Sequence, residues 1–210
     1  MLRTVAKRNS TAEEISLLNA LARLSARERQ QIIDDFVEWA FTGTDPGAPG
    51  AGIAQAMRQM PAELPDDPTL EQVDAWVELA ELVQDHSFQQ RVRQMAVEGA
   101  KGTPGQGGQG EQGEQGEPAV SPQLVTEHAG QALAEGIAPD SAAAKPILDQ
   151  IVPPETSVAD RRKLIEQLET FTDARIERYW QLMGIINGRP PFPPAVPQFD
   201  WMIRALRAHG

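Results

Sequence analysis

The 210-residue chain contains no cysteine. This absence excludes a disulfide scaffold, a thiolate metal site and a cysteine nucleophile, and it fits a reducing compartment. No apolar run approaches the ~18 residues of a membrane-spanning helix. The first residues also lack the long apolar stretch of a secretory signal peptide. We therefore expect a cytoplasmic protein that has no membrane partner.

Basic residues are scarce relative to acidic ones. The chain has 19 Lys and Arg against 30 Asp and Glu, a formal net charge of -11. Proteins that grip nucleic acid normally present a basic surface, so we expect no direct nucleic-acid contact by this chain. Hydrophobic residues make up 40% of the sequence, which is ordinary for a globular protein.

Alternating strand patterns are absent, and apolar residues recur at helical spacing throughout. The sequence therefore predicts an all-α fold, a compact bundle of about eight to ten short helices. Capping signals mark several expected helix starts, and glycines mark several ends. The expected starts are Ser25 with Glu28, Thr69 with Gln72, Asp85, Asp140, Ser157 with Asp160, and Thr172; the expected ends are Gly43, Gly99, Pro153 and Asn187-Gly188.

Residues 101–118 interrupt the helical pattern. Seven of these eighteen residues are Gly, and most of the others are Gln, Glu and Pro. The period of three in glycine lasts only four units, so a flexible linker is favoured over a collagen-like helix. We expect two helical halves, residues 1–100 and 120–210, joined by a linker at 101–119.

Sequence signals of enzyme chemistry are nearly absent. His86, His128 and His209 lie far apart, and none has the spacing of a metal ligand. The glycine-rich run lacks the flanking strand and helix of a phosphate-binding loop. We expect no catalytic residue, no metal and no cofactor, and hence no enzyme.

Four of the eleven aromatic residues are tryptophans. Trp39, Trp76 and Trp180 each fall on the expected apolar stripe of a helix, where core packing is the favoured interpretation. Trp201 lies about 200° around its helix from Phe199, off the expected stripe. It needs a second packing surface, a partner or a ligand cleft.

Aromatic residues also gather around a stretch with five prolines, residues 189–197, which we expect to be an extended arm. Such an arm over a helix pair would wall an aromatic cleft for a small molecule. Tyr179 and Asn187 are the candidate polar groups there, although Asn187 also suits a helix end. The candidate ligand-binding residues are Trp39, Trp76, Tyr179, Trp180, Met183, Asn187, Phe192 and Trp201.

Two stretches carry a family resemblance. One is residues 63–85, ELPDDPTLEQVDAWVELAELVQD, and the other begins with residues 179–188, YWQLMGIING, followed by Pro190-Pro191 and residues 199–209, FDWMIRALRAH. Both resemble the C-terminal effector regions of MerR-type transcriptional regulators, in the branch with long helical effector domains. The resemblance runs from about residue 16 to the end, apart from the glycine-rich insert.

The resemblance implies a sensing domain for an apolar or aromatic small molecule, such as an antibiotic. Members of this family place a winged helix-turn-helix and a dimerisation helix before the effector region, and we expect this chain to be the effector region without them. We expect any DNA contact to come through such a missing N-terminal domain. The metal-sensing branch uses cysteines, so their absence favours the drug-sensing branch.

Three functions remain open from the sequence. The chain is a sensing domain that closes its two halves round a ligand, a stand-alone protein that confers resistance by sequestering a drug, or a helical protein-interaction module. The last alternative includes a homodimer.

Overall fold

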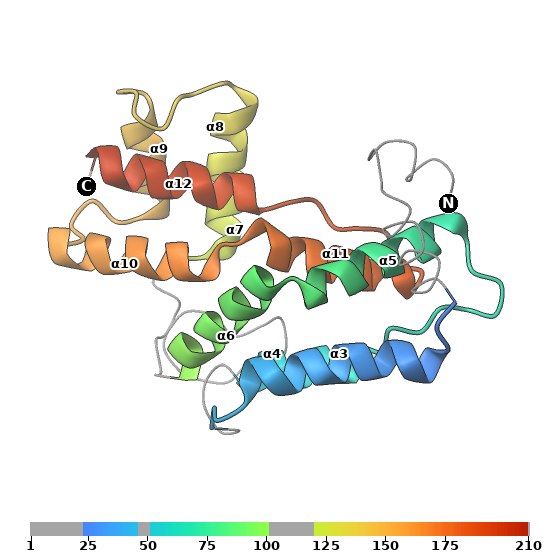
Figure 1. The fold of residues 1–210 in the computed structure, drawn as a ribbon. Coiled ribbons are helices and arrows are strands. Elements are labelled where there is room, and N and C mark those ends of the chain that lie inside the picture. The colour runs from blue at the N-terminus through green and yellow to red at the C-terminus, as the bar shows by residue number, and fades with distance from the viewer. Residues whose placement is uncertain (1–22, 46–50, 101–119, 210) are drawn as a thin grey trace.

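The structure, a computed structural model, describes residues 23–45, 51–100 and 120–209, without the side chains of residues 51 and 52 (Figure 1). These residues form helices and no strand, which confirms the all-α prediction and the bundle of eight to ten helices. In chain order the elements are α3 (Ala26–Phe41), α4 (Ala51–Gln59), α5 (Leu70–Gln84), α6 (His86–Ala100), α7 (Pro122–Leu124), the π-helical turn η1 (Val125–Ala129), α8 (Gly130–Ala134), α9 (Ala144–Ile151), α10 (Val158–Phe171), α11 (Ala174–Ile186) and α12 (Val196–His209).

The predicted capping residues begin several helices. Ser25 and Glu28 form a complete capping box at α3, and Thr69 with Gln72 forms one at α5. Ser157 accepts a hydrogen bond from the backbone N–H of Asp160 at the start of α10. These side chains satisfy N–H groups that a first helical turn leaves without partners.

Two predicted helix starts are wrong. The helix expected from Asp140 begins at Ala144, after a turn in which the Ser141 hydroxyl donates to the Ala138 carbonyl. The helix expected from Thr172 begins after Asp173, whose carboxylate side chain accepts from the backbone N–H of Arg175. Predicted ends at glycine are confirmed at Gly43 and Gly188, where positive φ values of 78° and 71° suit a residue without Cβ.

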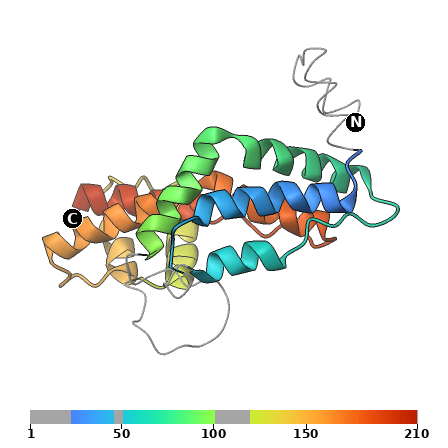
Figure 2. The same ribbon diagram turned by 60° about the horizontal axis from the view of Figure 1, so that its bottom comes forward.

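The buried hydrophobic residues form two clusters. The first cluster is surrounded by helices α3, α4, α5, α6 and α11. Within it α11 lies alongside α5, and α3 contacts α4, α5 and α6 (Figures 1 and 2). The first cluster consists of Ile33, Phe36, Val37, Ala40, Phe41, Ala54, Met57, Ala62, Ala75, Trp76, Leu79, Ala80, Val83, Phe88, Val92, Ala96, Tyr179, Leu182, Met183 and Ile186.

Helices α7 to α10 and α12 surround the second cluster, together with η1. Its buried residues are Val125, Ala129, Ala132, Ala144, Leu148, Ile151, Val152, Leu164, Leu168, Trp201, Met202, Ile203, Ala205 and Leu206. Helix α11 therefore follows the second-cluster helix α10 in sequence but packs in the first cluster. The expected division at residues 101–119 stays a prediction, and the flexible linker itself lies outside the described residues.

Polar contacts join the two clusters. Arg91 of α6 donates a hydrogen bond to the Glu169 carbonyl of α10, and its Nε lies 3.5 Å from an Asp173 oxygen. On α11, Glu177 accepts hydrogen bonds from the backbone N–H groups of Ala195 and Val196, which begin α12. These contacts are polar, and among the described residues the two clusters share no buried hydrophobic side chain.

No helix in the described part of the chain has both the length and the apolar character needed to cross a membrane.

Candidate functional site

The structure divides the eight candidate ligand-binding residues between the two clusters and the surface. Only some of them come together around α11. Trp76, Tyr179 and Met183 are fully buried in the first cluster, Trp180 packs against it and Asn187 ends α11, whereas Trp39 and Phe192 are exposed and Trp201 lies in the second cluster.

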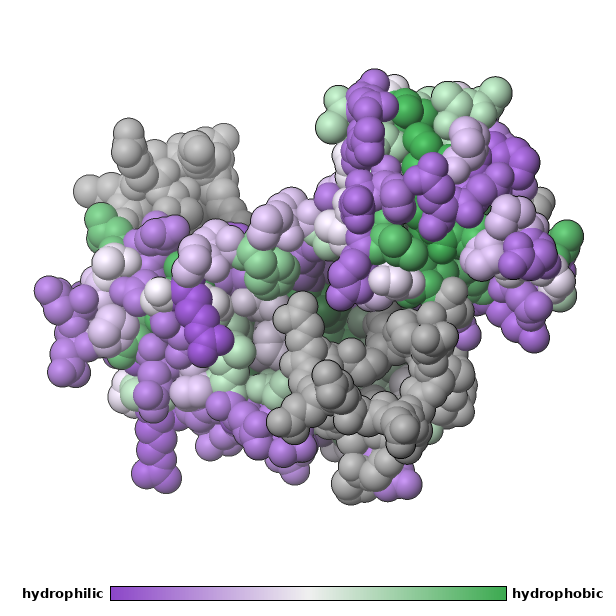
Figure 3. All heavy atoms as spheres, turned by 180° about the vertical axis from the view of Figure 1, so that it is seen from behind, coloured by the Kyte–Doolittle hydropathy of each residue, from purple (hydrophilic) through white to green (hydrophobic). Residues whose placement is uncertain are grey.

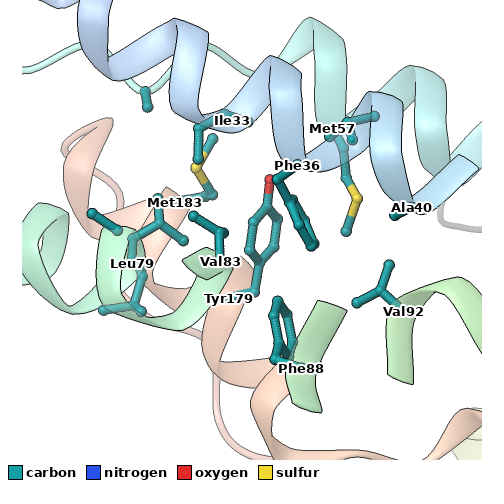
Figure 4. Close-up of a cluster of buried hydrophobic side chains, with 14 of the residues drawn as sticks. Ile33, Phe36, Ala40, Met57, Leu79, Val83, Phe88, Val92, Tyr179 and Met183 are labelled. Carbon is teal, nitrogen blue, oxygen red and sulfur yellow. The ribbon is translucent and has the colours of Figure 1, made fainter. Parts of the chain in front are cut away.

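Tyr179 lies in the middle of an aromatic group in the first cluster (Figure 4). Its ring centre is 6.2 Å from that of Phe36 on α3 and 6.5 Å from that of Phe88 on α6. The Trp180 ring meets it edge-on at 5.1 Å. Phe36 and Phe88 stack on each other at 5.6 Å, so rings from three helices enclose the phenol.

The Tyr179 hydroxyl is fully buried and has no hydrogen-bond partner among the described residues. Figure 4 shows it directed toward α3, near Phe36. Burial raises the pKa of this phenol far above its ordinary value, because a phenolate would have to form without water. The group is therefore a neutral hydroxyl whose hydrogen-bonding capacity is unused.

Trp76 is tied to the start of α3. The Arg29 guanidinium lies 5.9 Å from the Trp76 ring centre and donates hydrogen bonds to the carbonyls of Leu24 and Ala62. Burial lowers the pKa of Arg29, although the nearby Glu63 carboxylate opposes this effect. The guanidinium of Arg29 thus anchors α3 to the segment before α5. Trp76 itself has no exposed surface.

Trp39 departs from the expected stripe. The stripe of Ile32, Phe36 and Trp39 would turn Trp39 inward, but the residue is 39% exposed, and Ile33 and Val37 are buried instead. Apolar residues at adjacent positions of α3 allow two overlapping stripes, and periodicity does not choose between them. The Trp39 ring instead lies 5.8 Å from the Arg93 guanidinium and 6.4 Å from the His86 ring.

Asn187 and the arm close one end of the first cluster. The Asn187 side-chain N–H₂ donates to the carbonyl of Pro61 at 3.0 Å and to that of Met183 at 2.8 Å. It therefore ends α11 and also fastens the segment after α4 to it. In the arm, Phe192 is 46% exposed, and its carbonyl accepts from the Gln181 side chain of α11.

Trp201 finds the second packing surface that its position off the stripe requires. Its side chain is only 3% exposed, and its indole N–H donates to the Ile137 carbonyl at 2.8 Å. The expected stripe is also shifted, because Met202 and Ala205 are buried whereas Phe199 is only partly so. Trp201 therefore joins α12 to the loop after α8.

Within the described residues, no group of three or more His, Asp or Glu side chains is placed to hold a metal ion. His86, His128 and His209 lie on α6, η1 and α12.

The sequence analysis named Tyr179 and its neighbour Trp180 as candidates, but not Phe36 and Phe88, whose rings lie on either side of Tyr179. Phe36 and Phe88 both fall on predicted helical stripes, and the distance between them along the chain hides their stacking. The signal available in the sequence was composition: Tyr179 is the only tyrosine. A single hydroxyl on an otherwise apolar helix stripe is buried with that stripe and needs a hydrogen-bond partner there.

Comparison of the chain with protein-family models, with curated proteins and with solved structures finds no match.

Proposed function

We propose that the chain is a small-molecule-binding domain that takes up an apolar or aromatic ligand in the first cluster. The ligand would carry a hydrogen-bond acceptor, such as a carbonyl or ether oxygen, that pairs with the Tyr179 hydroxyl. The observation that carries this proposal is the unpartnered hydroxyl at the centre of the aromatic group. Sensing for a MerR-type transcriptional regulator is the role that the sequence resemblance adds.

The unused hydroxyl of Tyr179 carries an energetic cost. Leaving a buried polar group without a partner costs about 1–3 kcal/mol, and native proteins keep few such groups. Phenylalanine would fill the same apolar space without that cost. A ligand acceptor that reaches the hydroxyl recovers the lost hydrogen bond in a site already shielded from water. Ligand binding would therefore account for tyrosine in place of phenylalanine at position 179.

We propose that a ligand reaches Tyr179 from beneath α3, the helix toward which the hydroxyl is directed. At one end of α3 the Arg29 side chain donates to the Ala62 carbonyl and the Gln30 side chain accepts from the Ala62 N–H, so the helix is held to the segment after α4. At the other end Arg93 of α6 donates to the Trp39 and Thr42 carbonyls, both at 3.1 Å. Movement of α3 about either end would admit a ligand between Phe36 and Tyr179.

Helix α11 can transmit a structural change from the first cluster to the second. Tyr179 and Glu177 lie two residues apart on α11, and Glu177 holds the first N–H groups of α12. A ligand that shifts α11 would change this contact and so favour one arrangement of the second cluster. Sensing requires such a difference in affinity between two states, whereas drug sequestration requires binding alone.

A thermal-unfolding screen against natural products, read by tryptophan fluorescence, tests the proposal. A ligand present at about 100 times its dissociation constant adds about 2.7 kcal/mol of stability. For a domain of this size we expect a rise in Tm of about 5–10 °C. The absence of any shift in a folded sample contradicts ligand binding.

The variant Tyr179→Phe places the ligand. We expect it to weaken binding of the identified compound by about tenfold or more, since one hydrogen bond in a dry site is lost. Thr126→Val, which deletes an exposed hydroxyl on η1, is the matched control and keeps full affinity. Equal affinities for the Tyr179→Phe variant and the unchanged chain would move the site elsewhere.

Hydrogen exchange at the Ala195 and Val196 amides separates the two remaining roles. A sensing domain changes the protection of these amides when ligand binds, because Glu177 moves with α11. A sequestering protein binds with no change there.

A further inference from the structure

A groove of about 410 Å³ lies on the second cluster, whereas Tyr179 lies in the first. Its apolar lining includes Leu133 of α8, Ile137 after it, Pro197 of α12 and the buried Trp201. Leu133 is 41% exposed although it is a large aliphatic residue. Figure 3, the view from behind, shows hydrophobic surface gathered over the part of the molecule that holds the second cluster.

Two opposite charges line this groove, both on α12. Asp200 and Arg204 are exposed and stand one helical turn apart, which places them on the same face of the helix. Neither forms a hydrogen bond or an ion pair with any described residue. Comparable exposed pairs do form: Lys145 meets Asp149 at 3.3 Å, and Lys163 meets Asp160 at 3.6 Å.

We propose that this groove is the interface of a homodimer in which α12 packs antiparallel against α12 of a second copy. In a two-fold interface, residue i of one copy meets residue j of the other, and j meets i. A two-fold axis passing near residue 202 sets Asp200 opposite Arg204 of the second copy, twice in the same interface. The unpaired charges of one copy thus find their partners in the other.

The local charge balance supports this occupant over an unrelated partner. A chain with a net charge of -11 repels its own copies over most of its surface. Among the residues that line this groove one acid and one base cancel, and the other six are uncharged, most of them apolar. The face is thus neutral and partly apolar, and its two charges are complementary to those of a second copy across the two-fold axis, as a two-fold contact requires.

Charge reversal tests the interface in the full chain. Sedimentation equilibrium gives the dimer dissociation constant for the unchanged protein and for Asp200→Arg and Arg204→Asp. Each reversal sets two pairs of like charges in contact, and we expect each to weaken dimerisation by about tenfold or more. Lys163→Asp is the matched control, because it changes the net charge as Arg204→Asp does but lies on α10, and it leaves the constant within about twofold.

A mixture of the two single variants gives the decisive result. An Asp200→Arg copy carries two bases on this face and an Arg204→Asp copy carries two acids, so the mixture forms a heterodimer that neither variant matches alone. This rescue also shows that both variants fold. A monomer at every concentration overturns the proposal, as does a dimer that responds equally to Arg204→Asp and Lys163→Asp.

Discussion

The two clusters differ in whether the polar atom of a buried aromatic residue, Trp201 in one and Tyr179 in the other, has a hydrogen-bond partner. In the second cluster the indole N–H of Trp201 is satisfied by the Ile137 carbonyl, so the aromatic residue joins two elements. In the first cluster the hydroxyl of Tyr179 is satisfied by nothing in the described chain. A buried polar atom that is hydrogen-bonded has a structural role in the core. A buried polar atom without a partner needs another explanation, and a bound ligand is one.

The surroundings of the two residues differ in the same direction. Tyr179 is enclosed by the rings of Phe36, Phe88 and Trp180, whereas the residues buried around Trp201 are aliphatic and methionine side chains. Aromatic rings offer flat faces and edges on which a planar ligand can stack. The first cluster therefore has both aromatic rings for stacking and a hydrogen-bonding group without a partner. In the second cluster the indole N–H of Trp201 is already hydrogen-bonded, and no other aromatic ring is buried among its described residues.

Breaking each core in turn tests whether the clusters are separate units. Leu79→Ala in the first cluster and Leu148→Ala in the second each remove a fully buried side chain and should cost about 2–5 kcal/mol. Because the clusters meet through a few polar contacts, we expect faster hydrogen exchange mainly in the cluster that carries the substitution. The two variants serve as controls for each other, and equal acceleration in both clusters would contradict the division.

Local signals in the sequence predicted the fold class and most helix starts. A capping box such as Thr69 with Gln72 acts within four residues, so its outcome depends little on the rest of the chain. The glycine signals at Gly43 and Gly188 act locally in the same way. These elements were predictable because their causes are close in sequence.

Which face of a helix turns inward was less predictable. On α3, Ile32 and Trp39 compete with Ile33 and Val37 for the core, and the choice depends on α5, α6 and α11. The pairing of Phe36 with Tyr179 joins positions more than a hundred residues apart, and no periodicity encodes it. Tyr179 was predicted as a polar group, but its lack of a partner is a property of the packed structure alone.

The junction between the clusters is expected to weaken in acid. Burial raises the pKa of the Asp173 carboxyl, but hydrogen bonds from Arg175 and the charges of Arg175 and Arg91 outweigh burial and lower it overall. A lowered pKa means that the native state holds its proton less tightly than the unfolded chain does. The stabilisation is thus complete above the ordinary value of 3.8 and is lost as the pH falls through the native value.

Asp173→Asn tests this contribution. At neutral pH we expect a loss of about 1.5–3 kcal/mol, the usual worth of hydrogen bonds to a charged group. In strong acid the variant and the unchanged protein should be equally stable, as measured by urea unfolding. Asp66→Asn removes an exposed carboxylate in the loop before α5 and is the control. A loss that persists in acid would assign the effect to helix capping rather than to charge.

The smallest expected effect is the most direct contrast between the clusters. Tyr179→Phe should stabilise the ligand-free protein by about 1 kcal/mol, because it removes an unsatisfied buried hydroxyl. Trp201→Phe should destabilise it, because the Ile137 carbonyl loses its donor. Urea unfolding of both variants at neutral pH measures the two signs, and a loss of stability in both would contradict the contrast.

Alkaline pH separates the hydroxyl from the ring that carries it. Since burial raises the pKa of Tyr179, the unfolded chain releases the phenolic proton near its ordinary value of 10.0 while the native chain keeps it. Native stability therefore falls as the pH rises above that value. Tyr179 is the only tyrosine, so the Tyr179→Phe variant lacks this contribution entirely and its advantage over the unchanged chain should grow with pH. An advantage that stays constant from neutral to alkaline pH would mean that the hydroxyl already reaches water or a partner, and the first cluster would then have no unused group to offer a ligand.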